Sequence, residues 1–327
     1  MHHLTIPRML RALSATCLLG TALTAHTAHA AGWPDKPITL IVPSAAGGAA
    51  DLTARTFAQY LGAKIGQAVV VEDRPGAGGI VGTNAVKIAP ADGYTLLLAT
   101  NSTQSANQYL YKSLPYDAQR DFSPVGMLGT FGTVGIVPPD SPYKTIPQLV
   151  GYATRNPDKV FFGYYSSSSQ VPPELLKARA KIKISGVAYK NITQIITDLR
   201  GGQIGFAFVD YLTAMGQIDG KGLLPIAVTA AAPNPAWPGV PTVSSYYPDF
   251  VVAGWLGLAA PKGTPEDIVR KLNDYTRGAL RDAQTLAKFR SLGMEPKYMD
   301  LPTFNAFLDK DARLWKKWVA TAGIPPQ

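Results

Sequence analysis

Small residues follow the first strand-like segment of this sequence. Pro43–Asp51 reads Pro-Ser-Ala-Ala-Gly-Gly-Ala-Ala-Asp, and small side chains let a backbone approach a ligand closely. We expect Asp51 to be the N-cap of the next helix, whose free N–H groups suit a carboxylate or a phosphate. A tight strand-to-helix turn without a ligand accounts for the same residues equally well. The candidate ligand-binding residues here are Ser44, Ala45, Ala46, Gly47, Ala49 and Asp51.

Hydroxyl and amide side chains form a second candidate group. One run of serines lies between a predicted strand and a predicted helix, and a shorter polar run follows another strand. Hydroxyls and free N–H groups at such places can hydrogen-bond a carboxylate. A mobile polar loop is the alternative for the serine run. The candidates are Ser166, Ser167, Ser168, Ser169, Asn101 and Ser102.

Two further side chains come from the ends of predicted strands. Asp210 ends one strand, where the ligand sites of open sheets gather. Capping of the helix from Leu212 onward is an equally good role for it. Tyr189 supplies a phenol next to Lys190, and we include Tyr189 in the candidate site.

The glycine-rich segment Pro75–Gly82 resembles a dinucleotide-binding loop only superficially. With Gly76 and Gly78 as the first two glycines, the third position of the motif is Val81. No P-loop Lys-Ser/Thr pair follows. The sequence therefore does not favour nucleotide binding.

The first thirty residues have the pattern of an export signal. Arg8 and Arg11 precede the apolar stretch Ala12–Ala25, and Ala28-His29-Ala30 is a cleavage site of the A-x-A type. We expect cleavage before Ala31 and a periplasmic protein. A membrane anchor is the alternative, which the shortness of the stretch disfavours.

Removal of this segment changes the chemistry that is available. The single cysteine, Cys17, and all four histidines lie within it, and about 297 residues remain. The remaining chain has no Ser-His-Asp triad, no cysteine nucleophile, no disulfide, and no Cys or His zinc ligand. No pair of carboxylates stands out for acid/base work. We therefore predict no enzyme activity, no cofactor and no metal site.

Charge and composition indicate a folded protein without a nucleic-acid face. The chain is 46% hydrophobic and only 16% charged, which disfavours disorder, and its length suggests two domains. Loss of Arg8 and Arg11 leaves 29 basic against 22 acidic residues, a formal excess of +7. These charges are scattered and are not interleaved with aromatic residues. We infer a mild bias toward anionic ligands, with ordinary solvated surface as the alternative.

Strand-like and helical patterns alternate, which predicts a parallel α/β fold. Two apolar segments ending in proline, 129–138 and 253–261, are expected to cross between two lobes and form a hinge. A ligand cleft between the lobes follows from two crossings. The predicted strands are 38–42, 68–71, 95–99, 135–137, 161–164, 184–187, 205–209 and 224–228. The predicted helices are 51–65, 81–88, one starting at Thr145, 172–180, 192–199, 212–219, 265–280, 282–292 and 303–322.

Several segments, taken in order, resemble the substrate-binding proteins of tripartite tricarboxylate transporters, the Bordetella uptake (Bug) family. The resemblance covers essentially all of the chain after the signal. Its strongest part is Val70-Val71-Glu72-Asp73-Arg74-Pro75-Gly76-Ala77-Gly78-Gly79. The other parts are Trp33–Ile38, Pro43–Gly48 with Asp51 and Arg55, Asp92–Leu96, Tyr116-Asp117, Asp121–Val125, Pro241-Thr242, Trp255 and Pro261–Pro265.

This resemblance implies a periplasmic Venus flytrap, in which two α/β lobes close on a small organic carboxylate. Lobe 1 would comprise 31–132 plus 253–327, and lobe 2 would comprise 133–252. The implied partners are the integral membrane subunits of a tripartite tricarboxylate-type transporter, and a monomer is expected. In such proteins the loop matching Pro43–Asp51 holds one end of the ligand. The serine run, Tyr189 and Asp210 approach it from the other lobe.

The departures from the family pattern lie mostly in the cleft. Ser44 stands where an aromatic residue is common, which favours a ligand larger than a C4 diacid, such as an aromatic mono- or dicarboxylate. Two other functions fit less well. A sensor subunit for a membrane receptor needs the same cleft, and an exported hydrolase would need a Ser-Lys pairing with Lys190 that no motif supports.

Overall fold

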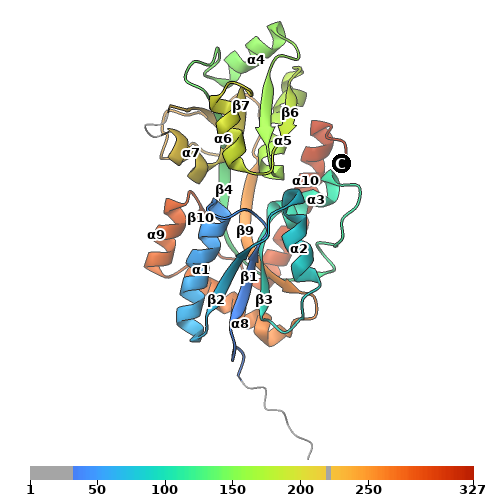
Figure 1. The fold of residues 1–327 in the computed structure, drawn as a ribbon, viewed down its shortest axis with the longest axis vertical. Coiled ribbons are helices and arrows are strands. Elements are labelled where there is room, and N and C mark those ends of the chain that lie inside the picture. The colour runs from blue at the N-terminus through green and yellow to red at the C-terminus, as the bar shows by residue number, and fades with distance from the viewer. Residues whose placement is uncertain (1–31, 219–221) are drawn as a thin grey trace, which may run out of the picture. The chain divides into compact units, whose positions relative to one another are not determined.

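The computed structural model describes residues 32–218 and 222–327, and every element below lies within Lys36–Gln327. Strands alternate with helices along this part of the chain, as the sequence predicted (Figure 1). The predicted export signal, with Cys17 and the histidines, lies outside the described residues.

The strands are β1 (Ile38–Val42), β2 (Val69–Asp73), β3 (Thr95–Thr100), β4 (Phe122–Val137), β5 (Phe161–Tyr164), β6 (Ser185–Ala188), β7 (Phe206–Asp210), β8 (Leu224–Val228), β9 (Ala253–Pro261) and β10 (Glu295–Pro296). The α-helices are α1 (Ala49–Ile65), α2 (Ile80–Lys87), α3 (Asn107–Leu110), α4 (Ile146–Arg155), α5 (Ser167–Ala180), α6 (Ile192–Arg200), α7 (Tyr211–Ile218), α8 (Glu266–Ala279), α9 (Ala283–Ser291) and α10 (Leu301–Ala322). Short helical turns are η2 (Ala77–Gly79), the π-helical η3 (Ser102–Ala106) and η4 (Val243–Ser245).

The ten strands among the described residues form one mixed sheet. Its order is β2-β1-β3-β9-β4-β7-β5-β6, and β8 and β10 each pair with β4. β1 lies parallel to β2 and β3, and β5 lies parallel to β6 and β7. β9 is antiparallel to both β3 and β4. The sheet of this predicted parallel α/β fold is therefore mixed, because β9 runs antiparallel to β3 and β4 through the centre of the sheet.

β4 connects the two parallel groups. Residues 122–132 of β4 pair with β9, and residues 133–136 pair with β7. Figure 1 shows β4 and β9 running between the elements around β1–β3 and those around β5–β7. The two segments predicted to cross are thus strands, and the isolated strand predicted at 135–137 is the end of β4. An apolar run without alternation does not distinguish a buried strand from other buried structure.

Helix α1 shows how the local sequence makes its own boundaries. Phe57 and Leu61 lie one turn apart on the face that packs on the sheet, and both are fully buried. The helix ends at Gly66, whose φ of 70° is accessible to glycine at little cost. The amide of Gly66 donates to the carbonyl of Gly62 at 3.0 Å.

Helix α10 ties the end of the chain to both groups of strands. Trp315 and Val319 are buried in one cluster with Leu175 and Leu176 of α5 and with Leu110 of α3. α10 therefore covers both the segment that follows β3 and the helix that follows β5. It begins at Leu301, two residues before the predicted start, with Asp300 as N-cap, and it stops at the C-cap Gly323 as predicted.

Helix α5 begins earlier than predicted, and the helical segment after β3 was not predicted as a helix. α5 starts at Ser167 rather than at Pro172, and the predicted polar loop after β3 leads directly into η3 and α3. In α5 the prolines misled the prediction, because a proline is usually taken to mark the first turn of a helix. The polar residues of η3 are buried, so no apolar stripe marks this segment as helical.

Candidate functional site

The loop after β1 is held by Asp51. Gly48 is the N-cap of α1 and makes no side-chain cap, so the predicted N-cap role of Asp51 is wrong. Asp51 is instead in the first turn of α1, where a carboxylate interacts favourably with the helix dipole. Its Oδ2 accepts a 2.7 Å hydrogen bond from the amide of Gly47, and the residue is 2% exposed. The helix begins before Asp51 because Gly48 and the alanines after it fit its first turn.

Arg55 and Asp73 support Asp51 from the solvent side. Arg55 lies one turn after Asp51, and its Nε is 2.6 Å from Oδ1 of Asp51. The Nη2 of Arg55 donates to Oδ2 of Asp73 at 2.9 Å. Burial and the neighbouring Asp51 carboxylate raise the pKa of Asp73 more than Arg55 lowers it. Two carboxylates thus share one guanidinium directly behind the loop.

Sequence analysis did not assign a role to Arg55 or to Asp73. The four-residue spacing of Asp51 and Arg55 on one helix was a usable signal for the first contact. The second contact depends on the pairing of β1 with β2, which puts Asp73 beside Val42. Nothing in the local sequence specifies that register.

The other side chains of this loop differ in exposure. Ser44 is half-buried, and its Oγ is buried with no hydrogen-bond partner among the described residues. Ala45, Ala46 and Gly47 are exposed, and Ala49 is half-buried. The Ser44 hydroxyl is therefore a buried polar group whose hydrogen-bonding capacity is unused among the described residues.

The glycine-rich turn after β2 packs against this loop. A Cβ at Gly79 would lie 2.8 Å from Cγ2 of Thr103 and 3.2 Å from the carbonyl oxygen of Pro43. A Cβ at Gly82 would lie 2.9 Å from Cα of Pro43. The glycines therefore bring the ends of β1, β2 and β3 together, which accounts for them without a nucleotide.

Four candidate side chains meet between the end of β3 and the start of α5. The Nδ2 of Asn101 donates to Oγ of Ser167 at 3.2 Å and to Oγ of Ser168 at 3.0 Å. The Oγ atoms of Ser102 and Ser167 are 2.7 Å apart. All four residues are buried. The structure thus joins the two polar runs to each other, which their separation in the sequence did not reveal.

Ser166 and Ser169 form the start of α5. The two side chains make a capping box, and Oγ of Ser169 accepts from the amides of Tyr165 and Ser166, both at 3.0 Å. These two serines therefore fix the helix terminus. The first-turn N–H groups of such a helix have no intrahelical acceptor.

Asp210 caps the helix after β7, which was the alternative role predicted for it. Its Oδ1 accepts from the amide of Thr213 at 2.9 Å, and its Oδ2 accepts from Oγ1 of Thr213 at 2.9 Å. The hydroxyl of Tyr165 lies 3.5 Å from Oδ2 of Asp210. Burial and this carboxylate raise the pKa of Tyr165, so the phenol stays protonated. Asp210 is thereby linked to the start of α5.

Tyr189 makes its hydrogen bond elsewhere. Its hydroxyl donates to Oδ2 of Asp198 on α6 at 2.7 Å. Partial burial and Asp198 raise its pKa to about 12. This side-chain bond leads away from the other candidates, although β6, which precedes Tyr189, ends on the same edge as β5.

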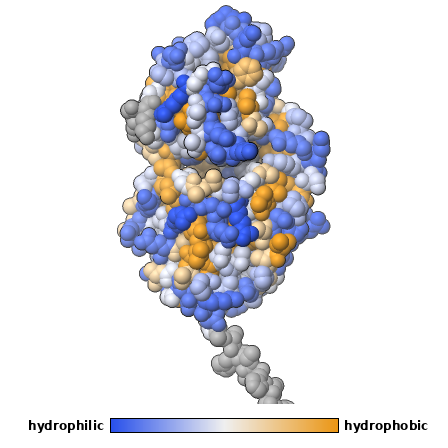
Figure 2. Space-filling view, in the orientation of Figure 1, coloured by the Kyte–Doolittle hydropathy of each residue, from blue (hydrophilic) through white to orange (hydrophobic). Residues whose placement is uncertain are grey.

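Most of the candidate residues follow the carboxyl ends of parallel strands. β1 and β3 end at the small-residue loop and Asn101, whereas β5 and β7 end at the serines and Asp210. Figure 2 shows a hollow in the surface between the elements around β1–β3 and those around β5–β7. Polar groups from both sets of strands thus converge where ligands of open α/β sheets bind.

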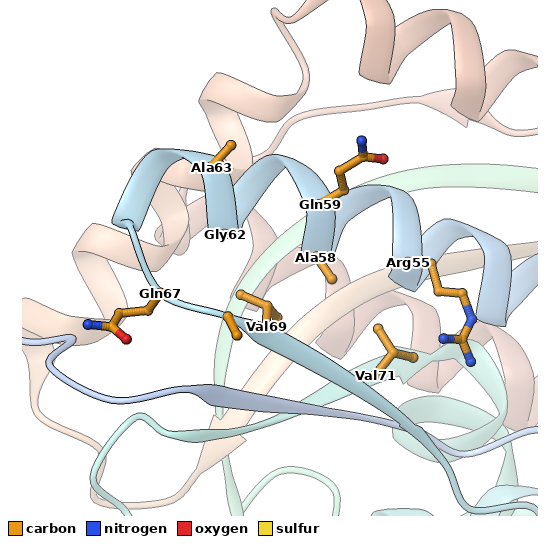
Figure 3. Close-up of a pocket in the computed structure, with 9 residues that line it drawn as sticks. Arg55, Ala58, Gln59, Gly62, Ala63, Gln67, Val69 and Val71 are labelled. Atoms are coloured by element: carbon orange, nitrogen blue, oxygen red, sulfur yellow. The ribbon is translucent and has the colours of Figure 1, made fainter.

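A separate groove lies on the outer surface between α1 and β2 (Figure 3). It is lined by Arg55, Ala58, Gln59, Gly62, Ala63, Gln67, Ala68, Val69 and Val71. None of the candidate ligand residues lines it, so it is not part of the site at the strand ends.

In residues 32–218 and 222–327 no cluster of His, Cys, Asp or Glu is suited to a metal ion. Within the same ranges, no helix has the length and apolar character needed to cross a bilayer.

Comparison with known proteins gives the family. A family model described as "Tripartite tricarboxylate transporter family receptor", or TctC, matches residues 53–324. The chain belongs to the TctC family. BugT of Bordetella pertussis is 31% identical over 309 residues, covering 93% of this chain and 95% of BugT. The resemblance to the Bug family is thereby confirmed.

Solved structures of TctC type have the same fold. R. palustris Rpa4515 with adipate is 29% identical with a TM-score of 0.86, over 90% of this chain and 100% of that one. MatC from Rhodopseudomonas palustris with bound malate is 26% identical with a TM-score of 0.80, over 88% and 99%. These similarities confirm the α/β flytrap class with two lobes. TctC proteins are periplasmic solute-binding proteins and not enzymes, as predicted.

Proposed function

We propose that this TctC protein captures a small organic carboxylate between its lobes and delivers it to the integral membrane subunits of a tripartite tricarboxylate-type transporter. The proposed lobes are 31–132 plus 253–327, and 133–252. We further propose export to the periplasm by a signal cleaved before Ala31, and action as a monomer. Family membership supports the solute-binding role.

The observation that carries the proposal is the contact between the two groups of strands at the end of β3. Asn101 follows β3 and donates to Ser167 and Ser168 at the start of α5. The start of α1 follows β1, which is the neighbour of β3 in the sheet. Each helix start offers N–H groups and the positive end of a helix dipole, which suit an anion. A carboxylate bound there would contact both lobes, and contacts to both lobes shift a flytrap toward its closed form.

We propose that the ligand contacts come mainly from the backbone and hydroxyl groups of the two helix starts. Ser44 supplies an unpartnered hydroxyl, and Asp51 acts through the Gly47 amide. The proposed ligand-binding set is Ser44, Ala45, Ala46, Gly47, Ala49, Asp51, Asn101, Ser102, Ser166, Ser167, Ser168, Ser169, Tyr189 and Asp210.

We propose a ligand longer than a C4 diacid, with aromatic mono- and dicarboxylates among the candidates. A serine rather than a ring at position 44 leaves room at one end of the cleft. Rpa4515 was solved with the C6 diacid adipate, whereas MatC was solved with the C4 diacid malate. These two relatives bracket the size range to be tested.

A thermal-shift panel tests both parts of this proposal. The purified chain from Ala31 onward would be heated with aliphatic diacids from malate to adipate and beyond, with aromatic mono- and dicarboxylates, and with amino acids as neutral controls. A ligand at 100 times its Kd stabilises the folded state by about 2.7 kcal/mol. We expect a shift with one group of carboxylates. A shift only with C4 and shorter acids would refute the size proposal, and no shift with any carboxylate would refute the function.

A further inference from the structure

The side-chain amide of Asn101 makes three hydrogen bonds to other residues. Asn101 is 1% exposed. Its two amide hydrogens are directed to Oγ of Ser167 and Oγ of Ser168, at 3.2 and 3.0 Å. Its Oδ1 accepts from the backbone amide of Trp255 at 3.4 Å. Because a backbone N–H can only donate, the Trp255 contact fixes which end of the amide faces which partner.

These three bonds join segments from different parts of the fold. Asn101 directly follows β3, and Trp255 lies on the neighbouring strand β9. The register pairs Thr100 with Leu256, so Asn101 and Trp255 belong to the same rigid part of the sheet. The serines belong to α5, which follows β5 in the other group of strands. The amide oxygen of Asn101 thus bonds to the β3–β9 part of the sheet, and the amide nitrogen bonds to α5 in the other group of strands.

We infer that Asn101 is a positioning residue for ligand binding, which aligns the first turn of α5 on the β3–β9 part of the sheet when the lobes are closed. This inference rests on the proposed function. Ser167 and Ser168 are the first two residues of α5, so their side-chain bonds to Asn101 determine where the free N–H groups of that turn point. The Ser102–Ser167 contact at 2.7 Å is a second, weaker link between the same segments.

The placement of these bonds separates binding from folding. The bonds from Asn101 to α5 join the two groups of strands. We therefore expect an open form to give them up while each group stays folded. Loss of the Asn101 side chain therefore acts on the closed form. The closed complex should release its ligand faster, whereas the ligand-free protein should be destabilised only by loss of the Trp255 bond, which lies within one group of strands.

Asn273 offers a matched control within one lobe. It is also buried, at 5% exposure, and its Nδ2 donates to the carbonyls of Val125 at 2.7 Å and Met299 at 3.2 Å. All three residues lie among the elements around the first part of β4 and α8. Asn273→Ala should therefore lower the melting temperature of the ligand-free protein and leave the Kd of the folded protein unchanged.

The test compares Asn101→Ala with Asn273→Ala and the unaltered chain, using the panel acid that stabilises the unaltered chain most. Titration calorimetry gives the Kd, and stopped-flow fluorescence gives the dissociation rate. Loss of two neutral hydrogen bonds predicts a Kd raised about tenfold or more for Asn101→Ala. We expect the rise to appear as faster dissociation, with the ligand-free melting temperature lowered less than in Asn273→Ala, because only the bond to Trp255 is lost within one group of strands.

A second variant covers the case in which Asn101→Ala folds poorly. The double variant Ser167→Ala with Ser168→Ala removes the same bonds from the α5 side, and alanine is well tolerated in a helix. It should show the same faster dissociation. Unchanged Kd and dissociation rate in either folded variant would overturn the positioning role while the proposed function stands. Failure of the unaltered chain to bind any carboxylate would overturn both.

Discussion

Replacement of Asp51 by alanine should affect both the stability of the fold and the ligand loop. The substitution removes a hydrogen bond from Gly47 to a buried charged acceptor, which contributes about 1.5–3 kcal/mol. It also removes the ion pair with Arg55, whose side chain is 49% exposed, so this pair adds at most about 1 kcal/mol. The free energy of unfolding should therefore fall by about 2–4 kcal/mol. That corresponds to a melting temperature lower by roughly 3–6 °C.

Ligand affinity should fall as well, because the amide of Gly47 is no longer held. If about 1.4 kcal/mol of the lost interaction appears in binding, the Kd rises about tenfold. The Kd and the melting temperature of Asp51→Asn should lie between those of the unaltered chain and of Asp51→Ala, since an amide oxygen can still accept from Gly47. The assay is differential scanning fluorimetry without ligand, followed by calorimetric titration with the best panel acid at a temperature where both variants are folded.

Asp300→Ala is the matched control for this experiment. Asp300 accepts from the amide of Thr303 at 2.9 Å at the start of α10 and makes no contact with the ligand loop. It should lower the melting temperature and leave the Kd unchanged. Unchanged melting temperature together with unchanged Kd in Asp51→Ala would refute the reasoning from the Gly47 contact.

Two further substitutions test carboxyl groups, those of half-buried Asp73 and buried Asp311. The raised pKa of Asp73 means that the folded protein binds this proton more tightly, so stability is lost as pH rises from near 3.8 through the folded pKa. Asp73→Asn should raise the melting temperature at pH 7, where the Asp73 carboxyl is charged, and not at pH 3.5, where it is largely protonated. An equal effect at both pH values would exclude repulsion between the Asp73 and Asp51 carboxylates as the cause. Trp255→Phe removes the 2.7 Å bond from Nε1 to buried Asp311, and urea unfolding should show a loss of about 1–3 kcal/mol, whereas an unchanged midpoint would contradict this.

The elements with clear periodicity and clear end signals were predictable from the sequence. Thr145 caps α4 and accepts from the amide of Gln148, as its spacing suggested. Gly323 ends α10 in the left-handed conformation. Strands β1, β3, β5 and β8 match the predicted apolar runs within one residue. These features depend on interactions within a few residues, which a local pattern can report.

The rest depends on contacts between distant segments. β9 is an apolar run whose partners, β3 and β4, are remote in the sequence, so its pairing was not visible. The segment Ser102–Ala106 is polar and buried, a combination that depends on partners such as Ser167. The candidate residues were predicted from segments that are separate in the sequence. Their junction through Asn101 became apparent only from the structure.

The place of β9 in the sheet has a consequence for biosynthesis. β9 comes from residues 253–261, yet it is the strand inserted between β3 and β4. A nascent chain that ends before residue 253 therefore leaves both neighbours with unsatisfied edges, which are templates for pairing with other chains. Completion of the sheet also requires closure of a long loop, which slows folding. We therefore expect C-terminal truncations to aggregate rather than yield a functional fragment, and this chain to depend on holding factors until its last quarter is available.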